Sequence, residues 1–338
     1  MNIFIIYTGG TIGMVQDESG TFVPFDFELI KRNLPDLSRL DYKLTVHSFN
    51  PIIDSSNMTP SIWIEMAQII KDNYEEYDGF VILHGSDTMA FSASILSFLL
   101  EGLQKPVIFS GSQLPIGEIR TDARENMMTA LEIASAKHNG KSIVQEVCIL
   151  FDNKLFRGNR SFKYNSAKFE AFRSPNYPVL AEAGIHLKYN FDDLMNNSDK
   201  EFICHNHVDD KVAVLKLFPG INASTIKSVL DSDVRSVVME TFGSGNTTTD
   251  KWFLDLLSDA IKQGKNILNI SQCKVGSVEL GRYETSQGLK NIGVLNGYDM
   301  TFEAAVTKLM YLQGELADQD AVAYWIEKDI RGELTVND

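Results

Sequence analysis

The chain has 338 residues, 44% hydrophobic and 22% charged, which is typical of a globular protein long enough for two domains of about 150 residues each. Its 31 basic and 45 acidic residues give a net charge of −14, and a field of that sign disfavours nucleic acid and anionic membrane surfaces as partners. The three cysteines are dispersed, without metal or redox spacing. We find no secretory pattern before the first expected strand and no apolar run near the ~20 residues that cross a bilayer. These features predict a cytoplasmic protein.

The first half of the chain alternates expected strands with expected helices. Residues 2–7 form a near-continuous apolar run, as in a strand buried on both faces. Thr59 and Pro60 resemble an N-cap followed by proline at the first helical position. This alternation predicts a mostly parallel sheet with flanking helices. The expected order is strand 2–7, helix 60–74, strand 79–83, helix 89–101, strand 106–110, loop and helix 121–136, and strand 146–151.

A polar stretch rich in Asn, Asp and Ser, residues 190–200, interrupts this pattern and is typical of a linker. A second α/β series follows it. The sequence therefore predicts a larger N-terminal α/β domain (1–188), a linker (189–211) and a smaller C-terminal α/β domain (212–338). The second series is expected as strand 212–217, helix 223–230, strand 234–240, helix 252–262, strand 267–270, helix 300–313 and a last helix before Arg331.

A glycine-rich turn, residues 8–13 (TGGTIG), directly follows the first strand. Ligands bind at the carboxyl ends of strands in open parallel sheets. The turn fits neither the phosphate-loop nor the three-glycine dinucleotide pattern. It does present a hydroxyl, Thr11, whose restricted χ1 suits a nucleophile, although a hydroxyl nucleophile needs a base.

A second polar loop, residues 84–88 (HGSDT), follows the strand 79–83. It pairs the Ser86 hydroxyl with the adjacent Asp87 carboxylate, which could bind an ammonium group or polarise a lysine. The competing interpretation is an Asx-type turn or a helix cap, which is the commoner use of such a pair. The loop alone leaves both interpretations open.

These two segments together resemble the signature pair of the asparaginase/glutaminase family. The resemblance extends over nearly the whole chain and is closest to the bacterial cytoplasmic type I branch. Five further segments support it in order: 54–58 (DSSNM), 109–113 (FSGSQ), 157–160 (RGNR), 218–220 (FPG) and 242–246 (FGSGN).

The resemblance implies a role for each matching residue. Thr11 matches the nucleophile that attacks the amide carbon and forms an acyl-enzyme while ammonia leaves. Ser86, Asp87 and Lys163 match the second catalytic group, in which a neutral lysine can act as base. The oxyanion would be held by the backbone N–H groups of Thr11 and Ser86. The residues implied in substrate binding are Asp54, Ser55, Ser56, Ser86 and Asp87.

The same resemblance implies the overall reaction and its setting. The expected reaction is hydrolysis of free L-asparagine to L-aspartate and ammonia, with no metal and no organic cofactor. Two α/β domains per chain are expected to assemble as homodimers or homotetramers.

Three positions depart from the family pattern. Ser86 stands where the family usually has threonine, and it keeps the hydroxyl, so we expect activity to survive. Phe22 stands where a tyrosine usually lies near the nucleophile, which shifts weight to Lys163 and bound water. Glu240 stands where some type I enzymes use an arginine in a second, regulatory asparagine site, so a site of that form is not expected here.

Several residues have plainer interpretations that the sequence cannot set aside. Lys163 by itself would be a solvated surface lysine, and His84 a hydrogen-bonding structural residue. The segment 204–207 (CHNH) lies in the expected linker without a second ligand cluster, so we expect a loop and no metal. Asp122 and Asn126 are expected to cap or brace the helix that follows the turn of residues 110–113.

Two other functions remain open at this point. One is a glutaminase-type amidohydrolase or the asparaginase-like subunit of a tRNA amidotransferase. One methylene is worth only ~1–3 kcal/mol of discrimination, so the sequence does not give the preference between asparagine and glutamine. The other is a non-catalytic sensor of asparagine or aspartate that shares the pocket of Ser55, Ser56 and Asp87. Release of ammonia separates a sensor from an enzyme.

Overall fold

A computed structural model describes residues 1–16, 22–24, 42–282 and 284–336. The chain divides into two compact units, residues 1–206 and 207–338, and each contains its own sheet. In the described part of the chain, no helix is both long and apolar enough to cross a membrane. The predicted fold class, a larger mostly parallel α/β unit followed by a smaller α/β unit, is confirmed.

The first unit is built on an eight-stranded sheet. Five adjacent strands that reach one edge of the sheet are parallel, and three strands in antiparallel pairing extend the sheet on the other side. In spatial order the strands are β15 (Leu187–Tyr189), β14 (Ala181–Ala183), β11 (Lys154–Arg157), β10 (Val147–Phe151), β7 (Val107–Ser110), β5 (Gly79–Leu83), β1 (Asn2–Tyr7) and β4 (Lys43–Ser48).

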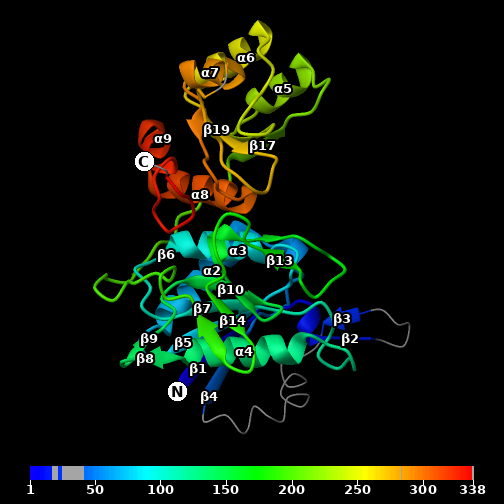
Figure 1. Cartoon of the computed structure of the whole chain (residues 1–338), viewed down its shortest axis with the longest axis vertical. Coiled ribbons are helices and arrows are strands. Elements are labelled where there is room, and N and C mark those ends of the chain that lie inside the picture. The colour runs from blue at the N-terminus through cyan, green and yellow to red at the C-terminus, as the bar shows by residue number, and fades with distance from the viewer. Residues whose placement is uncertain (17–21, 25–41, 283, 337–338) are drawn as a thin grey trace. The chain divides into compact units, whose positions relative to one another are not determined.

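Three helices cover the two faces of this sheet. Figure 1 shows α2 (Pro60–Asp72) and α3 (Met89–Leu99) on one face and α4 (Ala123–Ser135) on the other. Residues 3–7 of β1 are all buried, so the strand contributes to both layers. Alternate β1 side chains, Ile3 and Ile5, pack in the core cluster that includes Met127 and Leu131 of α4.

Short elements complete the first unit around this sheet. Three are single 3₁₀ turns, and the rest are two-stranded ribbons. They are η1 (Thr11–Gly13), η3 (Ser55–Asn57), η4 (Gly158–Arg160), β2 (Met14–Gln16) with β3 (Phe22–Pro24), β6 (Leu100–Glu101) with β16 (Ile203–Cys204), β8 (Lys137–His138) with β9 (Lys141–Ser142), and β12 (Phe162–Lys163) with β13 (Phe172–Arg173).

The second unit is a four-stranded parallel sheet. Its elements are β17 (Val212–Lys216), α5 (Ala223–Leu230), β18 (Ser236–Thr241), α6 (Lys251–Lys262), β19 (Asn266–Ser271), α7 (Glu284–Asn291), β20 (Leu295–Asn296), α8 (Phe302–Glu315) and α9 (Gln319–Ile326). Leucine, isoleucine and phenylalanine side chains of α5, α6 and α7 form one core cluster with the strands, and α8 and α9 also contact the sheet.

Candidate active site

The two signature loops leave the sheet side by side. Strands β1 and β5 are parallel neighbours with Tyr7 opposite Leu83, so both end at the same edge. The backbone N–H and the hydroxyl of Thr8 each donate to the Leu83 carbonyl oxygen at 3.0 Å. The first residue of the glycine-rich turn is therefore fixed to the last residue of the strand that leads into the second loop.

Glycines allow three loops to meet at this edge. A Cβ atom at Gly10 would lie 2.6 Å from the Cα of Gly85, and one at Gly85 would lie 2.5 Å from the Ser55 hydroxyl oxygen. Gly10 also has φ +92° and ψ 173°, a combination that is essentially confined to glycine. The turn that carries Thr11 and the loop that carries Ser86 thus pack backbone to backbone, and the Ser55 side chain of the η3 turn packs against Gly85.

The η3 turn holds three of the predicted substrate-binding residues. Asp54 Oδ1 accepts hydrogen bonds from the Ser56 N–H at 2.8 Å and from the Ser56 hydroxyl at 2.7 Å. These bonds, the backbone one first, lower the pKa of Asp54. Ser55 is buried, and its carbonyl oxygen accepts from the Thr88 hydroxyl at 2.6 Å. The turn is therefore fastened to the second signature loop as well.

Lys163 reaches the second signature loop from a distant part of the chain. It is the last residue of β12, and its Nζ donates to Ser86 Oγ at 2.8 Å and to Asp87 Oδ1 at 2.5 Å. The Lys163 side chain is 18% exposed, whereas that of Asp87 is 67% exposed. The structure thus brings together the hydroxyl, the carboxylate and the amine that the resemblance implies as one group.

His84, the first residue of this loop, is buried and uncharged. Burial lowers its pKa to about 4, so the ring is neutral at physiological pH. Its Nδ1 lies 2.6 Å from the Gly85 carbonyl oxygen and its Nε2 lies 2.9 Å from Ser92 Oγ. Both nitrogens are engaged inside the protein, which agrees with the structural role expected for His84.

Asp122 and Asn126 hold the turn that follows β7, the strand next to β5, by hydrogen bonds to its backbone. The Asp122 carboxylate accepts the backbone N–H groups of Gln113 and Leu114, and Asn126 donates to the Gly111 carbonyl oxygen at 2.9 Å. Asp122 occupies the N-cap position of α4 without a side-chain cap bond. Asp122 therefore does not cap the helix with its side chain; it accepts from Asn126 of α4 at 3.2 Å and ties the helix start to the turn after β7.

Other residues considered in the sequence lie elsewhere. His205 Nε2 lies 3.0 Å from Glu101 Oε2, and among the described residues no group of three or more His, Cys, Asp or Glu side chains could hold a metal ion. Glu240 lies in the second unit, and its carboxylate is 3.5 Å from the Nζ of Lys216. The expectation about Phe22 concerns a side chain outside the part of the chain that the structure describes.

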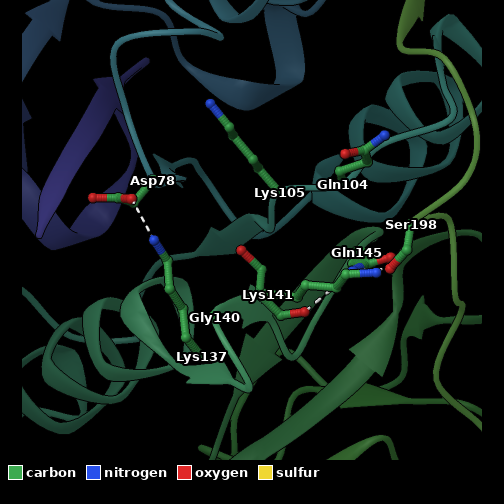
Figure 2. A pocket seen from close by; sticks show the side chains of 9 residues that line it. Asp78, Gln104, Lys105, Lys137, Gly140, Lys141, Gln145 and Ser198 are labelled. Atoms are coloured by element: carbon green, nitrogen blue, oxygen red, sulfur yellow. Dashed lines mark hydrogen bonds and ion pairs between the residues drawn. The ribbon is translucent and has the colours of Figure 1, made fainter.

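A cavity of about 200 Å³ lies at the opposite edge of the first unit's sheet (Figure 2). Asp78 immediately precedes β5 and Lys105 precedes β7, so both lie at the amino ends of these strands. Figure 2 shows Lys137 turned toward Asp78, with Nζ 2.7 Å from Oδ1, and Lys105 donates to the Tyr74 carbonyl oxygen. These charges have partners, and the cavity contains none of the predicted site residues.

Sequence reasoning missed two residues of the site's support, Trp63 and Ser92. Both are buried, and each hydrogen-bonds toward His84 rather than toward solvent. Ser92 lies in a helix that is buried all round, so hydrophobic periodicity gives no signal for it. Only the packing of α2 against α3 reveals the contact.

Comparisons with known proteins find matches along nearly the whole chain. Residues 2–194 match the family model described as Asparaginase, N-terminal, and residues 211–326 match the Glutaminase/Asparaginase C-terminal domain. L-asparaginase 1 of Escherichia coli is 40% identical over 340 residues, covering 100% of this chain and 99% of that protein. A 60 kDa lysophospholipase of mouse is 40% identical over 364 residues, covering 99% of this chain and 62% of that protein. The crystal structure of L-asparaginase I from Vibrio cholerae superposes with a TM-score of 0.91 at 38% identity, covering 99% of each chain.

Proposed function

The chain belongs to the asparaginase/glutaminase family, and from this premise we propose that it hydrolyses L-asparagine to L-aspartate and ammonia with Thr11 as nucleophile. The observation that carries the proposal is the convergence of the Thr11 turn with Ser86, Asp87 and Lys163 at one edge of the sheet. A threonine in a turn that packs against the loop of Ser86 and Asp87, with Lys163 hydrogen-bonded to both, supports a role in acyl transfer.

The first half of the reaction forms an ester. Thr11 Oγ attacks the side-chain amide carbon of asparagine, and its proton passes to the Ser86–Lys163 pair. The backbone N–H groups of Thr11 and Ser86 stabilise the oxyanion. The C–N bond then breaks, the proton goes to the departing nitrogen, and ammonia leaves.

The second half consumes water. A water molecule attacks the acyl carbon, the same pair takes its proton, and the C–O bond to Thr11 breaks to release aspartate and restore the threonine hydroxyl. The pair is well placed for this, because Lys163 Nζ lies 2.8 Å from Ser86 Oγ.

Substrate binding follows from the charges at the edge of the site. The exposed Asp87 carboxylate suits the substrate α-ammonium group. The η3 turn, with Asp54, Ser55 and Ser56, suits the α-carboxylate and the backbone atoms of asparagine. Assembly into dimers or tetramers and a cytoplasmic location stay predictions.

The test is ammonia release from asparagine and from glutamine, with the wild-type protein beside Thr11→Ala. We expect turnover of asparagine that falls by at least about 1,000-fold in Thr11→Ala, while circular dichroism and the melting temperature stay unchanged. The ratio of kcat/KM for the two amides measures the preference. Binding of asparagine without ammonia release would instead establish the sensor, and full turnover by Thr11→Ala would remove the threonine mechanism.

A further inference from the structure

A chain of buried side chains lies beneath the second signature loop. Trp63 Nε1 donates to Ser92 Oγ at 2.9 Å, and Ser92 Oγ lies 2.9 Å from His84 Nε2. His84 Nδ1 lies 2.6 Å from the Gly85 carbonyl oxygen. The three side chains are 7%, 0% and 1% exposed in that order, so water does not compete for these bonds.

The protons in this chain have one consistent arrangement. A carbonyl oxygen only accepts, so His84 Nδ1 carries the ring proton and donates it to Gly85. His84 Nε2 is then the acceptor and takes the Ser92 hydroxyl proton. Ser92 Oγ in turn accepts the indole N–H of Trp63. Each bond polarises the next, so the chain acts as a unit that ends on one backbone carbonyl.

That carbonyl belongs to the peptide that joins Gly85 to Ser86. In a planar trans peptide, the C=O of one residue and the N–H of the next point in opposite directions. A Gly85 carbonyl held toward the buried His84 ring therefore directs the Ser86 N–H away from the ring. Gly85 has no side chain to restrain this peptide, and its Cα faces the backbone of Gly10.

We propose that His84, held by Ser92 and Trp63, is a positioning residue that fixes the direction of the Ser86 N–H as an oxyanion donor. The inference rests on the proposed function, in which this N–H stabilises the oxyanion. Neutral imidazole is required, because a doubly protonated ring would present two donors and leave the Ser92 hydroxyl without its acceptor. The low pKa of His84 keeps the ring in that form.

The decisive experiment compares His84→Asn with His84→Gln. The Asn amide nitrogen is as many bonds from Cα as His Nδ1 and can still donate to the Gly85 carbonyl oxygen. The Gln amide lies one bond further, so its oxygen can replace Nε2 as the acceptor of the Ser92 hydroxyl proton, but its nitrogen does not stand at the position of Nδ1. We expect kcat to fall about tenfold in His84→Gln, with KM for asparagine within about twofold, because loss of a whole oxyanion donor costs about 100–1,000-fold.

The ranking of the two variants separates positioning from packing. Glutamine fills more of the space left by the ring, so a purely structural role predicts the greater kcat and melting temperature for His84→Gln. The positioning role predicts the greater kcat for His84→Asn, even where its melting temperature is lower. A kcat for His84→Gln equal to or above that of His84→Asn would overturn the proposal.

Ser92→Ala gives a second measurement in case the His84 variants do not fold. It removes the hydroxyl between Trp63 and His84, and we expect kcat to fall about threefold to tenfold with KM unchanged. Ser94→Ala is the matched control, because Ser94 is also a fully buried serine of α3, and its hydroxyl donates to Gly158 at 3.5 Å. Equal kcat in Ser92→Ala and Ser94→Ala would overturn the proposal while wild-type turnover left the proposed function standing. A wild-type protein that releases no ammonia would overturn both.

Discussion

The two units share a parallel-sheet plan but bury different polar groups near their strand ends. In the first unit, the neutral His84 lies after β5 with both nitrogens hydrogen-bonded. In the second unit, Glu240 is the next-to-last residue of β18 and interacts electrostatically with Glu303 of α8. One carboxyl oxygen of Glu303 is buried and finds no hydrogen-bond partner among the described residues.

This difference shows that two parallel sheets of the same plan can carry different chemistry, because the side chains at and after their strand ends differ. In the first unit, glycines and uncharged hydrogen bonds let three loops pack closely and leave Ser86, Asp87 and Lys163 grouped at the edge. In the second, burial and the nearby Glu240 charge raise the pKa of Glu303 to about 7, and none of the predicted catalytic residues lies there.

The largest expected difference between the two units comes from alanine substitutions at one glycine of each unit. Gly10 and Gly220 have φ +92° and +93°, but a Cβ atom would collide with Gly85 only at Gly10, and nothing lies within 4 Å of one at Gly220. We expect Gly10→Ala to lower kcat more than about 100-fold, because it displaces the loops at the site. It should also destabilise the first unit by at least about 3 kcal/mol.

Gly220→Ala is the control for backbone strain alone. It should cost about 1–2 kcal/mol, the usual penalty for a left-handed non-glycine residue, with kcat unchanged. Urea unfolding and ammonia release check both variants. Equal activity in the two variants would mean that the contact between Gly10 and Gly85 does not shape the site.

A smaller expected difference is the opposite pH dependence of the stabilities of the two units. The pKa of His84 is about 4 in the folded protein against 6.5 for the free side chain, so the unfolded chain binds the proton first. As pH falls from 6.5 to 4, the first unit should lose up to about 3 kcal/mol of stability. The pKa of Glu303 is raised from 4.5 to about 7, so the second unit should gain up to about 3 kcal/mol as pH falls from 7 to 4.5.

Urea unfolding at a series of pH values checks these opposite slopes. Trp63 reports on the first unit, and Trp252 and Trp325 report on the second. Glu303→Gln should flatten only the second unit's slope. Parallel slopes in the two units would contradict the assignment of either buried group.

The smallest expected difference concerns two helix N-caps. Asn222 accepts the Thr225 N–H at 3.0 Å ahead of α5, so Asn222→Ala should cost about 1 kcal/mol. Thr59 stands at the N-cap of α2, as predicted, but its hydroxyl faces Ser61 Oγ and makes no cap bond. Thr59→Ala should therefore cost less than about 0.5 kcal/mol, and equal shifts in the urea midpoint would contradict this reading of the caps.

Local sequence patterns predicted most of the α/β framework. The strands 79–83 and 2–7 and the helix 223–230 have the predicted bounds, because an apolar run or a helical repeat depends only on near neighbours. The antiparallel edge strands β11, β14 and β15 received no prediction, since they are only three or four residues long. Their existence depends on the sheet edge against which they pair.

The sequence by itself also determined where hydroxyls and glycines follow strands. The motifs that contain Thr11, Ser86 and Asp87 identified the family. The family resemblance grouped Lys163 with Ser86 and Asp87, but only the tertiary structure shows the contacts that join such distant groups. Lys163 lies 77 positions from Ser86, and Ser92 reaches His84 across a helix. Such contacts arise when separate segments pack on one sheet, so no local pattern can encode the distance between them.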